Sequence, residues 1–191
     1  MSAQHRLHRP LGLVVAAVSL AACADRPAPL APPQPAEAGA LASAASAADY
    51  HRTLAELRRV TARYHDVNVA THDGFVPVTS ACEEEEGGET MPIPYASFDR
   101  LLDGALDPSL PDALLYEPEA NGRLRLVGVE MAMPYPLWTA TEPPTFLGVP
   151  LQREDALGVY GLHVWVWYDN PAGMFAEANP RVTCAGQVAG L

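Results

Sequence analysis

The sequence predicts an α+β fold in which an N-terminal amphipathic helix packs on a small antiparallel sheet, with one disulfide bond. Apolar residues recur at helical spacing in residues 48–73. Short runs rich in β-branched or aromatic residues follow, separated by turn-forming residues, and strands and helices do not alternate as a parallel sheet requires. Cys82 and Cys184 are the two cysteines that lie beyond the N-terminal region.

The helix is predicted to span residues 48–73. Asp49 is the expected N-cap, and Gly74 is the expected left-handed residue that ends the helix. Side chains three and four positions apart share a helix face. The predicted apolar face contains Leu57, Val60, Tyr64, Val67 and Thr71.

The remaining elements are predicted to be a short helix within 96–106 and several strands. Asn121-Gly122 is a strong turn signal, so residues 113–117 and 123–133 are expected to form a hairpin. Residues 160–168 have the strongest strand composition, and residues 181–184 are a last extended piece. Five prolines make residues 134–150 a loop.

The N-terminus has the pattern of an export signal. Two arginines precede an apolar run of about a dozen residues, too short to cross a bilayer core of roughly 30 Å. The run ends in Leu20-Ala21-Ala22-Cys23, which resembles the lipobox of bacterial lipoproteins. This resemblance implies cleavage after residue 22, attachment of diacylglycerol to the Cys23 thiol, a palmitate-bearing anchor, and location at the bacterial cell membrane or outer membrane. The alternative is an ordinary signal peptide with a chance cysteine.

The chain is therefore expected to have three parts. Residues 1–22 form the signal, residues 23–47 form a lipidated Cys and a Pro/Ala-rich tether, and residues 48–191 form one α+β domain. The formal net charge of −11 changes to −13 once Arg6 and Arg9 are removed with the signal. Such an acidic protein repels nucleic acid. Membrane contact is expected to come from the lipid.

Cys82 and Cys184 are expected to form the disulfide, because two cysteines in an exported protein usually bond to each other. The bond would close a loop of about 100 residues, worth on the order of 4 to 5 kcal/mol in the chain-entropy model. A redox or metal-binding pair is the alternative, although no Cys-x-x-Cys spacing supports it.

One cluster of residues is a candidate site. In the strand predicted at 123–133, alternation places Val127, Val129, Met131 and Met133 on one face and Gly128 and Glu130 on the other. In the strand predicted at 160–168, Leu162, Val164 and Val166 share one face, and the opposite face carries His163, Trp165 and Trp167. If both strands share a sheet in register, Glu130 and His163 lie together. They would act as acid and base, or bind a divalent metal with His65 as third ligand. The alternative is a packed core in which Glu130 is the hydrogen-bond partner of His163.

Other acidic residues are weaker candidates. Asp107, Asp112 and Glu117 are possible members of a carboxylate pair, but acidic residues are too common in this chain for that to carry weight. The acidic run at 83–89 does not fit the EF-hand spacing and is expected to be a solvated loop. No G-x-S-x-G, H-E-x-x-H, P-loop or G-x-G-x-x-G motif occurs.

From residue 64 onward the chain resembles an uncharacterised family of exported bacterial proteins. The matching segments are Tyr-His-Asp-Val at 64–67, Gly-Phe-Val-Pro at 74–77, Leu-Leu-Tyr-Glu-Pro at 114–118, Leu-Val-Gly-Val-Glu at 126–130, Leu-His-Val-Trp-Val-Trp at 162–167, Asn-Pro-Ala-Gly-Met-Phe at 170–175 and Asn-Pro at 179–180, with both cysteines. Similar proteins tend to carry Met-Gly-x-His-Tyr where this chain has Met91-Pro92-Ile93-Pro94-Tyr95. Pro94 therefore replaces a histidine that would have been a third ligand, and the resemblance implies no established activity.

Together these features favour a lipid-anchored, non-enzymatic domain that binds a small ligand, a metal or a protein partner. The main alternative is an envelope hydrolase that uses Glu130 and His163, with or without a metal. A purely structural envelope protein is the third possibility. Its mark would be a buried Trp165/Trp167 face without a concave site.

Overall fold

The computed structural model describes residues 35–84 and 90–187. The predicted signal at 1–22, Cys23 and the first part of the predicted tether lie outside the described residues, as does the part of the acidic run at 85–89. Within the described ranges, no helix combines the length and apolar character needed to span a membrane.

The helical region differs from the predicted single helix. Helix α1 (Pro35–Thr61) starts earlier, within the predicted tether, so Asp49 lies inside the helix and is not its N-cap. A 3-10 helix η1 (Ala62–His65) and a short helix α2 (Val67–His72) follow. The break is at Asp66, whose extended backbone ends η1 and whose carboxylate accepts a hydrogen bond from the Asn68 backbone amide at 3.0 Å.

The end of the helical region matches the prediction. Gly74 has φ +91°, a conformation that glycine adopts without steric cost. The backbone amide of Gly74 donates to the Thr71 carbonyl, and that of Phe75 donates to the Ala70 carbonyl. These two hydrogen bonds form a Schellman motif. The motif turns the chain into the sheet and buries Phe75.

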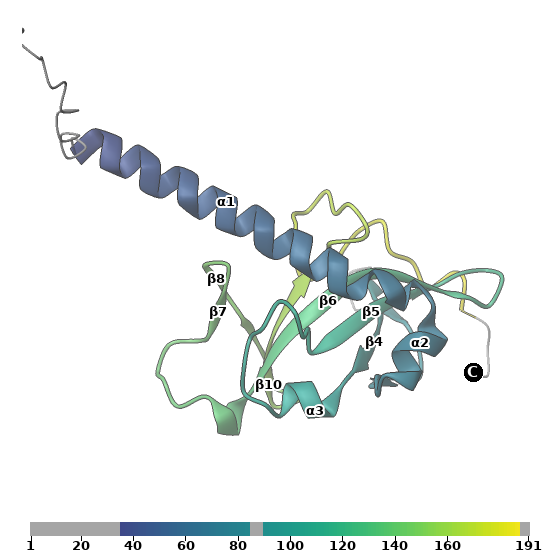
Figure 1. Cartoon of the computed structure of the whole chain (residues 1–191). Coiled ribbons are helices and arrows are strands. Elements are labelled where there is room, and N and C mark those ends of the chain that lie inside the picture. Colours follow the sequence, from purple (N-terminus) through teal and green to yellow (C-terminus); the bar gives the residue numbers. More distant parts are fainter. Residues whose placement is uncertain (1–34, 85–89, 188–191) are drawn as a thin grey trace, which may run out of the picture.

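A six-stranded antiparallel sheet forms the body of the molecule, in the order β1-β4-β5-β6-β10-β9 (Figure 1). Its strands are β1 (Val76–Pro77), β4 (Ile93–Ala96), β5 (Ala113–Pro118), β6 (Leu124–Pro134), β10 (Val159–Val164) and β9 (Gln152–Glu154). The smaller elements are β2 (Glu83–Glu84) paired with β3 (Thr90–Met91), β7 (Thr145–Phe146) paired with β8 (Val149–Pro150), helix α3 (Phe98–Leu101) and 3-10 helix η2 (Tyr135–Leu137). The predicted α+β class with an antiparallel sheet is confirmed.

The β5–β6 hairpin turns at the predicted Asn121-Gly122 site, where Gly122 has φ +77°. Between Leu115 and Tyr116 the register shifts, because one extra residue of β6 forms a β-bulge. The bulge moves Val127 to the other face, where it packs with Leu115 and Trp165. The prediction that Val127 shares a face with Val129 is therefore wrong.

The main core lies on the face of the sheet that the end of α1, η1 and α2 cover (Figure 1). Its strand residues include Leu114, Tyr116, Val129, Met131, Met133, Leu162 and Val164, and its helical residues include Leu54, Leu57, Tyr64 and Ala70. The larger part of α1 extends away from the sheet (Figure 1). The predicted helix-on-sheet packing is thus made by its last turns and the elements that follow.

The strand predicted at 160–168 ends at Val164, where the chain bends. The Val166 amide donates to the Val164 carbonyl, and the Trp165 amide donates to the Met174 carbonyl. Trp165 is buried on the second face, with its ring 5.7 Å from that of His163. Because of the bend, Trp167 returns to the helical side and its indole N–H donates to the Thr61 hydroxyl at 3.0 Å. The prediction that Trp167 shares a face with His163 is therefore wrong.

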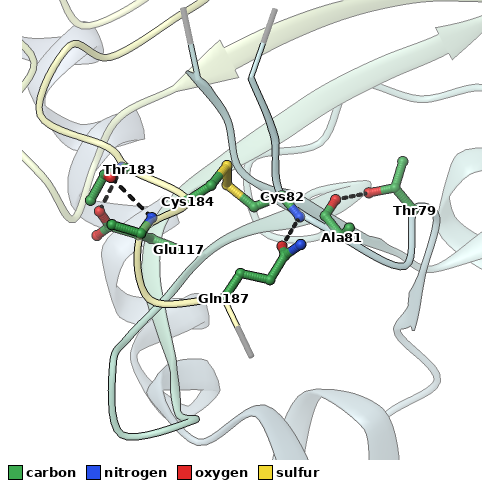
Figure 2. The surroundings of a disulfide bond; sticks show 8 residues. Thr79, Ala81, Cys82, Glu117, Thr183, Cys184 and Gln187 are labelled. Atoms are coloured by element: carbon green, nitrogen blue, oxygen red, sulfur yellow. Dashed lines mark hydrogen bonds between the residues drawn. A yellow bond between two sulfur atoms is a disulfide. The ribbon is translucent and has the colours of Figure 1, made fainter. Parts of the chain in front are cut away.

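The predicted Cys82–Cys184 disulfide is confirmed and links residues 102 positions apart (Figure 2). The Cys82 amide also donates to the Gln187 side-chain carbonyl at 2.6 Å. Residues 181–184, predicted as an extended piece, form no strand with the described sheet. The disulfide and side-chain hydrogen bonds hold this segment instead.

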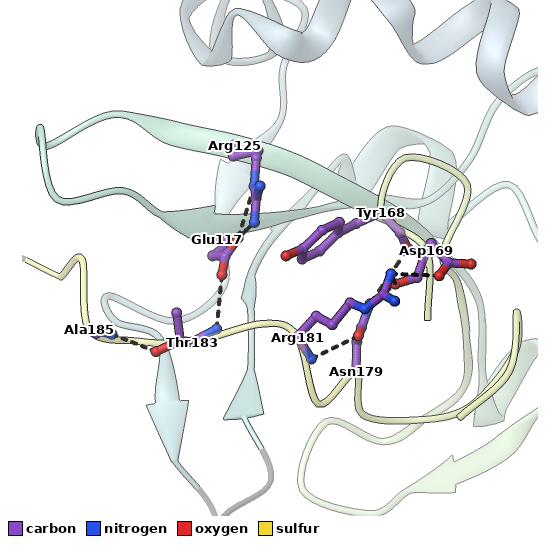
Figure 3. Close-up of polar contacts among 8 residues, drawn as sticks. All are labelled: Glu117, Arg125, Tyr168, Asp169, Asn179, Arg181, Thr183 and Ala185. Carbon is purple, nitrogen blue, oxygen red and sulfur yellow. Dashed lines mark hydrogen bonds and ion pairs between the residues drawn. The ribbon is translucent and has the colours of Figure 1, made fainter. Parts of the chain in front are cut away.

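A buried carboxylate makes the second attachment of that segment (Figure 3). Glu117 is 3% exposed; its Oε1 accepts from the Thr183 amide at 2.9 Å, and its Oε2 accepts from the Arg125 guanidinium. The same guanidinium lies 4.1 Å from the centre of the Tyr168 ring. The carboxylate therefore joins the β5–β6 hairpin to the C-terminal segment.

Candidate functional site

The second face of the sheet has small side chains at its centre. Ala96 of β4, Ala113 of β5 and Ala132 of β6 occupy this face, whereas the neighbouring positions on the helical face are large, as with Tyr95 and Leu114. Among the described elements, the helix that borders these small residues is the four-residue α3, which is too short to cover them fully. The result is a cavity on this part of the second face, beside the smaller packed cluster of Leu115, Val127, Trp165 and Val182.

The cavity has a volume of about 110 Å³ and mostly apolar walls. Its lining comprises Val78, Pro94, Ala96, Phe98, Leu101, Asp112, Ala113, Glu130, Ala132, Leu157 and Val159. Three of these apolar residues are substantially exposed: Val78 by 37%, Phe98 by 53% and Leu157 by 56%. Exposed apolar side chains grouped beside a cavity are typical of a surface that contacts a ligand.

Asp112 is the first of two carboxyl groups in this lining. It immediately precedes β5 and is 1% exposed. Its Oδ2 accepts a hydrogen bond from the Ala132 amide at 2.8 Å, which holds the side chain against β6. Its Oδ1 has no partner, and no other buried side-chain nitrogen or oxygen in the described part of the chain lacks one.

The surroundings of Asp112 disfavour its ionised form. Burial, the largest cause, and the negative charges of Asp103 and Glu130 together raise the pKa of Asp112 to about 7. The hydrogen bond from the Ala132 amide acts in the opposite direction. Both protonation states are therefore accessible near neutral pH, which is common at functional sites and uncommon elsewhere.

Glu130 is the second carboxyl group. It lies in the middle of β6, opposite Ala113 on one neighbouring strand and His163 on the other. Burial raises the pKa of Glu130; the positive charge of His163 lowers it and the negative charge of Glu177 raises it. Its side chain and that of Glu154 occupy the space where a Cβ atom on Gly161 would lie. Glu130 thus stands between the main cavity and a smaller recess beside His163.

His163 and Glu130 are brought together, as the sequence pattern predicted. They are direct partners in the β6–β10 register. The Nδ1 of His163 lies 2.6 Å from the Glu177 carbonyl oxygen. A carbonyl can only accept, so Nδ1 carries the proton, and Nε2 is the nitrogen with a free lone pair in the neutral ring. The recess beside them has a volume of about 10 Å³, at the lower limit of what one water molecule needs.

His65 does not join this pair. Its ring packs at 4.4 Å against Trp167 on the helical side of the sheet, whereas Glu130 and His163 lie on the other face. Across the residues that the structure describes, no three His, Cys, Asp or Glu side chains are arranged to hold a metal ion. Pro94, which stands where the resembling proteins tend to carry histidine, lines the main cavity.

Sequence reasoning gave Asp112 too little weight among the acidic residues. Asp107 accepts hydrogen bonds from the Ser109 amide and hydroxyl, and Glu117 binds Arg125, so both are engaged elsewhere. Asp112 alone of these three joins Glu130 in the cavity. The available signal was its position: a carboxylate directly before a strand that is buried along its whole length.

No protein-family model, curated protein or solved structure matches the chain. The features that bear on function are the cavity and its two carboxyl groups.

Proposed function

We propose that the protein is an exported, lipid-anchored binding domain, and that its cavity holds a small, mainly apolar molecule bearing a hydrogen-bond donor. The observation that carries the proposal is the unpartnered Oδ1 of Asp112, buried among apolar walls. The family resemblance and the Leu-Ala-Ala-Cys motif supply the expected location: cleavage before Cys23 and lipid attachment at the bacterial cell membrane or outer membrane.

A ligand with a donor group would supply the hydrogen bond that Asp112 Oδ1 lacks in the folded protein. A buried polar atom without a partner destabilises a protein by about 1 to 3 kcal/mol. A donor group bound at Asp112 Oδ1 recovers part of that free energy, while its apolar part contacts the alanines and the exposed residues Phe98 and Leu157. The site combines the two properties of small-molecule sites, apolar walls and few polar anchors.

The second proposal is acid/base chemistry at Glu130 and His163. The Glu177 carbonyl fixes the His163 ring in the tautomer whose Nε2 accepts a proton, as an orienting group does in hydrolases. The adjoining recess is small, so substrate would have to approach from the main cavity. Hydrolysis of simple ester substrates, lost in His163→Gln but retained in the helical-side variant His65→Gln, would support this proposal over simple binding.

The binding proposal is tested by filling the cavity. Methyl signals of Ala96, Ala113 and Ala132 are followed by NMR while 1-butanol or n-butylammonium is added to the full chain carrying Cys23→Ser. We expect saturable shifts with at least one of the two probes. Ala96→Leu inserts a larger side chain into the cavity and should abolish the shifts at the remaining alanines.

Ala55→Leu is the matched control, because Ala55 lies on the exposed side of α1 and not in the cavity. It should leave binding unchanged. If neither probe gives saturable shifts, or if Ala96→Leu binds as the parent chain does, the binding proposal is wrong.

A further inference from the structure

We propose that the ligand's donor group is an alkylammonium, so that the cavity selects small organic cations with a short apolar stem. This inference rests on the proposed binding function and specifies its ligand class. The geometry that points to it is the placement of two carboxyl groups, Asp112 and Glu130, in a lining whose other members are apolar.

The lining lacks a compensating cation. Among its described members there is no arginine or histidine, and neither Asp112 nor Glu130 takes part in an ion pair within the described ranges 35–84 and 90–187. His163, the partner of Glu130 in the strand register, lines the recess together with it. The described lining of the cavity therefore carries two acidic groups and no basic group to neutralise them.

Arg100 is the cationic residue closest in sequence to the cavity wall, and its contacts lead elsewhere. Its guanidinium donates to the Pro111 carbonyl at 3.2 Å and to the Tyr64 hydroxyl at 3.3 Å. It also lies 4.6 Å from the centre of the Phe75 ring. These contacts hold Arg100 toward the helical side, so it does not supply the missing partner of Asp112 Oδ1.

An ammonium group fits the two acids better than a neutral donor does. It carries a positive charge and three N–H donors, whereas a hydroxyl offers one. Binding an ion normally requires removal of water from both charges, which offsets much of their attraction. Here Asp112 has already lost its water on folding, so only the ammonium must be dehydrated. Charge-assisted hydrogen bonds to such a carboxylate are about twice as strong as neutral ones.

The shape of the site sets the size of the stem. A dry cavity of about 150 Å³ is known to hold benzene. The volume of about 110 Å³ here therefore suits a chain of about four carbons. Phe98 and Leu157 at the rim would contact anything longer. The acidic chain, with formal net charge −11, also attracts cations over a distance.

The test compares two probes of equal size, n-butylammonium and 1-butanol, in the same NMR titration at pH 8. We expect n-butylammonium to bind about tenfold more tightly, since hydrogen bonds to charged groups exceed neutral ones by roughly that factor. Asp112→Asn should weaken n-butylammonium about tenfold and change 1-butanol by less than about threefold. Asp99→Asn, an exposed acid-to-amide change on α3, is the matched control and should change neither.

The outcomes separate the two proposals. If 1-butanol binds as tightly as n-butylammonium, the cavity binds ligands but the ammonium inference is overturned. If neither binds, the proposed function itself fails. The comparison of probes uses the parent chain, so the inference can be tested even if Asp112→Asn does not fold.

A third probe, Nα-acetyl-lysine methylamide, distinguishes the two sources of an alkylammonium group. Binding comparable to n-butylammonium would identify a lysine side chain of a protein partner as an acceptable source. Much weaker binding would restrict the site to free amines. Either result supports alkylammonium recognition, provided that n-butylammonium itself binds more tightly than 1-butanol.

Discussion

The carboxyl group of Glu130 occupies space that a side chain on Gly161 would fill. A Cβ atom built on Gly161 would lie 2.7 Å from Glu130 Oε1 and 3.3 Å from Cγ of Glu154. Glu130 and Gly161 come from neighbouring strands, so the missing side chain on β10 allows the acid on β6 to fold over the sheet. The glycine thus has a positioning role in the candidate site.

Substitution of Gly161 should displace the Glu130 side chain and change the free energy of unfolding only slightly. The atom nearest to the new methyl group in Gly161→Ala is the far end of a flexible side chain, so Glu130 can rotate away. We expect a stability change within about 1 kcal/mol and a clear shift of the Glu130 side-chain carboxyl 13C signal. Urea unfolding and NMR measure the two effects.

Gly128→Ala is the natural comparison. Its Cβ would lie 2.9 Å from the Val164 carbonyl oxygen, a backbone atom that cannot rotate away. We expect a loss of about 2 to 3 kcal/mol. Equal destabilisation by the two substitutions would contradict the role assigned to Gly161.

Asp112 should make stability fall as pH rises. Burial raises its pKa to about 7 from an ordinary value of 3.8, so the folded state binds a proton that the unfolded state has lost. The contribution is complete below the unfolded pKa and disappears as pH rises through the folded one. Between pH 5 and pH 8 it should decline by about 3 kcal/mol.

The difference between Asp112→Asn and the parent chain isolates this effect, because the other acids are common to both. Urea unfolding at several pH values should show the Asn variant gaining stability relative to the parent as pH rises. Asp99→Asn, on exposed α3, should show no such trend. A difference independent of pH for Asp112→Asn would mean that the carboxyl group is not held in its neutral form.

Glu117 is expected to be a major contributor to stability. Glu117→Ala removes the acceptor of the Thr183 amide and the partner of Arg125, and leaves a cavity in a buried region. We expect a loss of about 3 kcal/mol in thermal or urea unfolding. The neighbouring pair Glu119 and Arg123 is more exposed, with 3.8 Å between the charged atoms. Glu119→Ala should cost less than about 1 kcal/mol, and similar losses from both variants would refute the assignment.

Lipid attachment at Cys23 is tested directly by labelling. In a bacterial host fed radioactive palmitate, the full chain should incorporate label and sediment with membranes. Cys23→Ser should lose both properties, because a hydroxyl does not replace the thiol as acceptor. Ala24→Ser, one position further, should retain the label. Membrane association of unlabelled Cys23→Ser would indicate another mode of attachment.

Local sequence signals predicted much of the fold. The Asn121-Gly122 turn, the Gly74 helix end and the antiparallel sheet follow from backbone preferences of single residues and from side-chain alternation. The errors arose where tertiary packing changes the alternation. The bulge at Val127 and the bend after Val164 each transfer a side chain to the opposite face. Gly128, next to the bulge, is a local signal that side-chain alternation ignores, whereas residues 162–167 around the bend contain no glycine or proline.

The candidate site was predicted only in part. The pairing of Glu130 with His163 depends on alternation and register, and the strand pattern was sufficient for it. Asp112 and the cavity depend on which small residues of β4, β5 and β6 meet on the second face, and on how the short helix α3 and Leu157 line the space beside them. His65 was placed with the site because helical spacing does not reveal which face of a sheet a helix will cover.

Helix α1 gives the domain a fixed reach. Its 27 residues rise about 40 Å along the helix axis, and its core residues Leu54 and Leu57 lie in the last turns. A flexible chain of the same length would have an average end-to-end distance of about 30 Å, with wide fluctuations down to near contact. The helix replaces that distribution with a single length, so it acts as a strut. The helix therefore keeps its first residue, Pro35, at a set distance from the cavity, and that distance limits how closely the domain can approach whatever lies at Pro35.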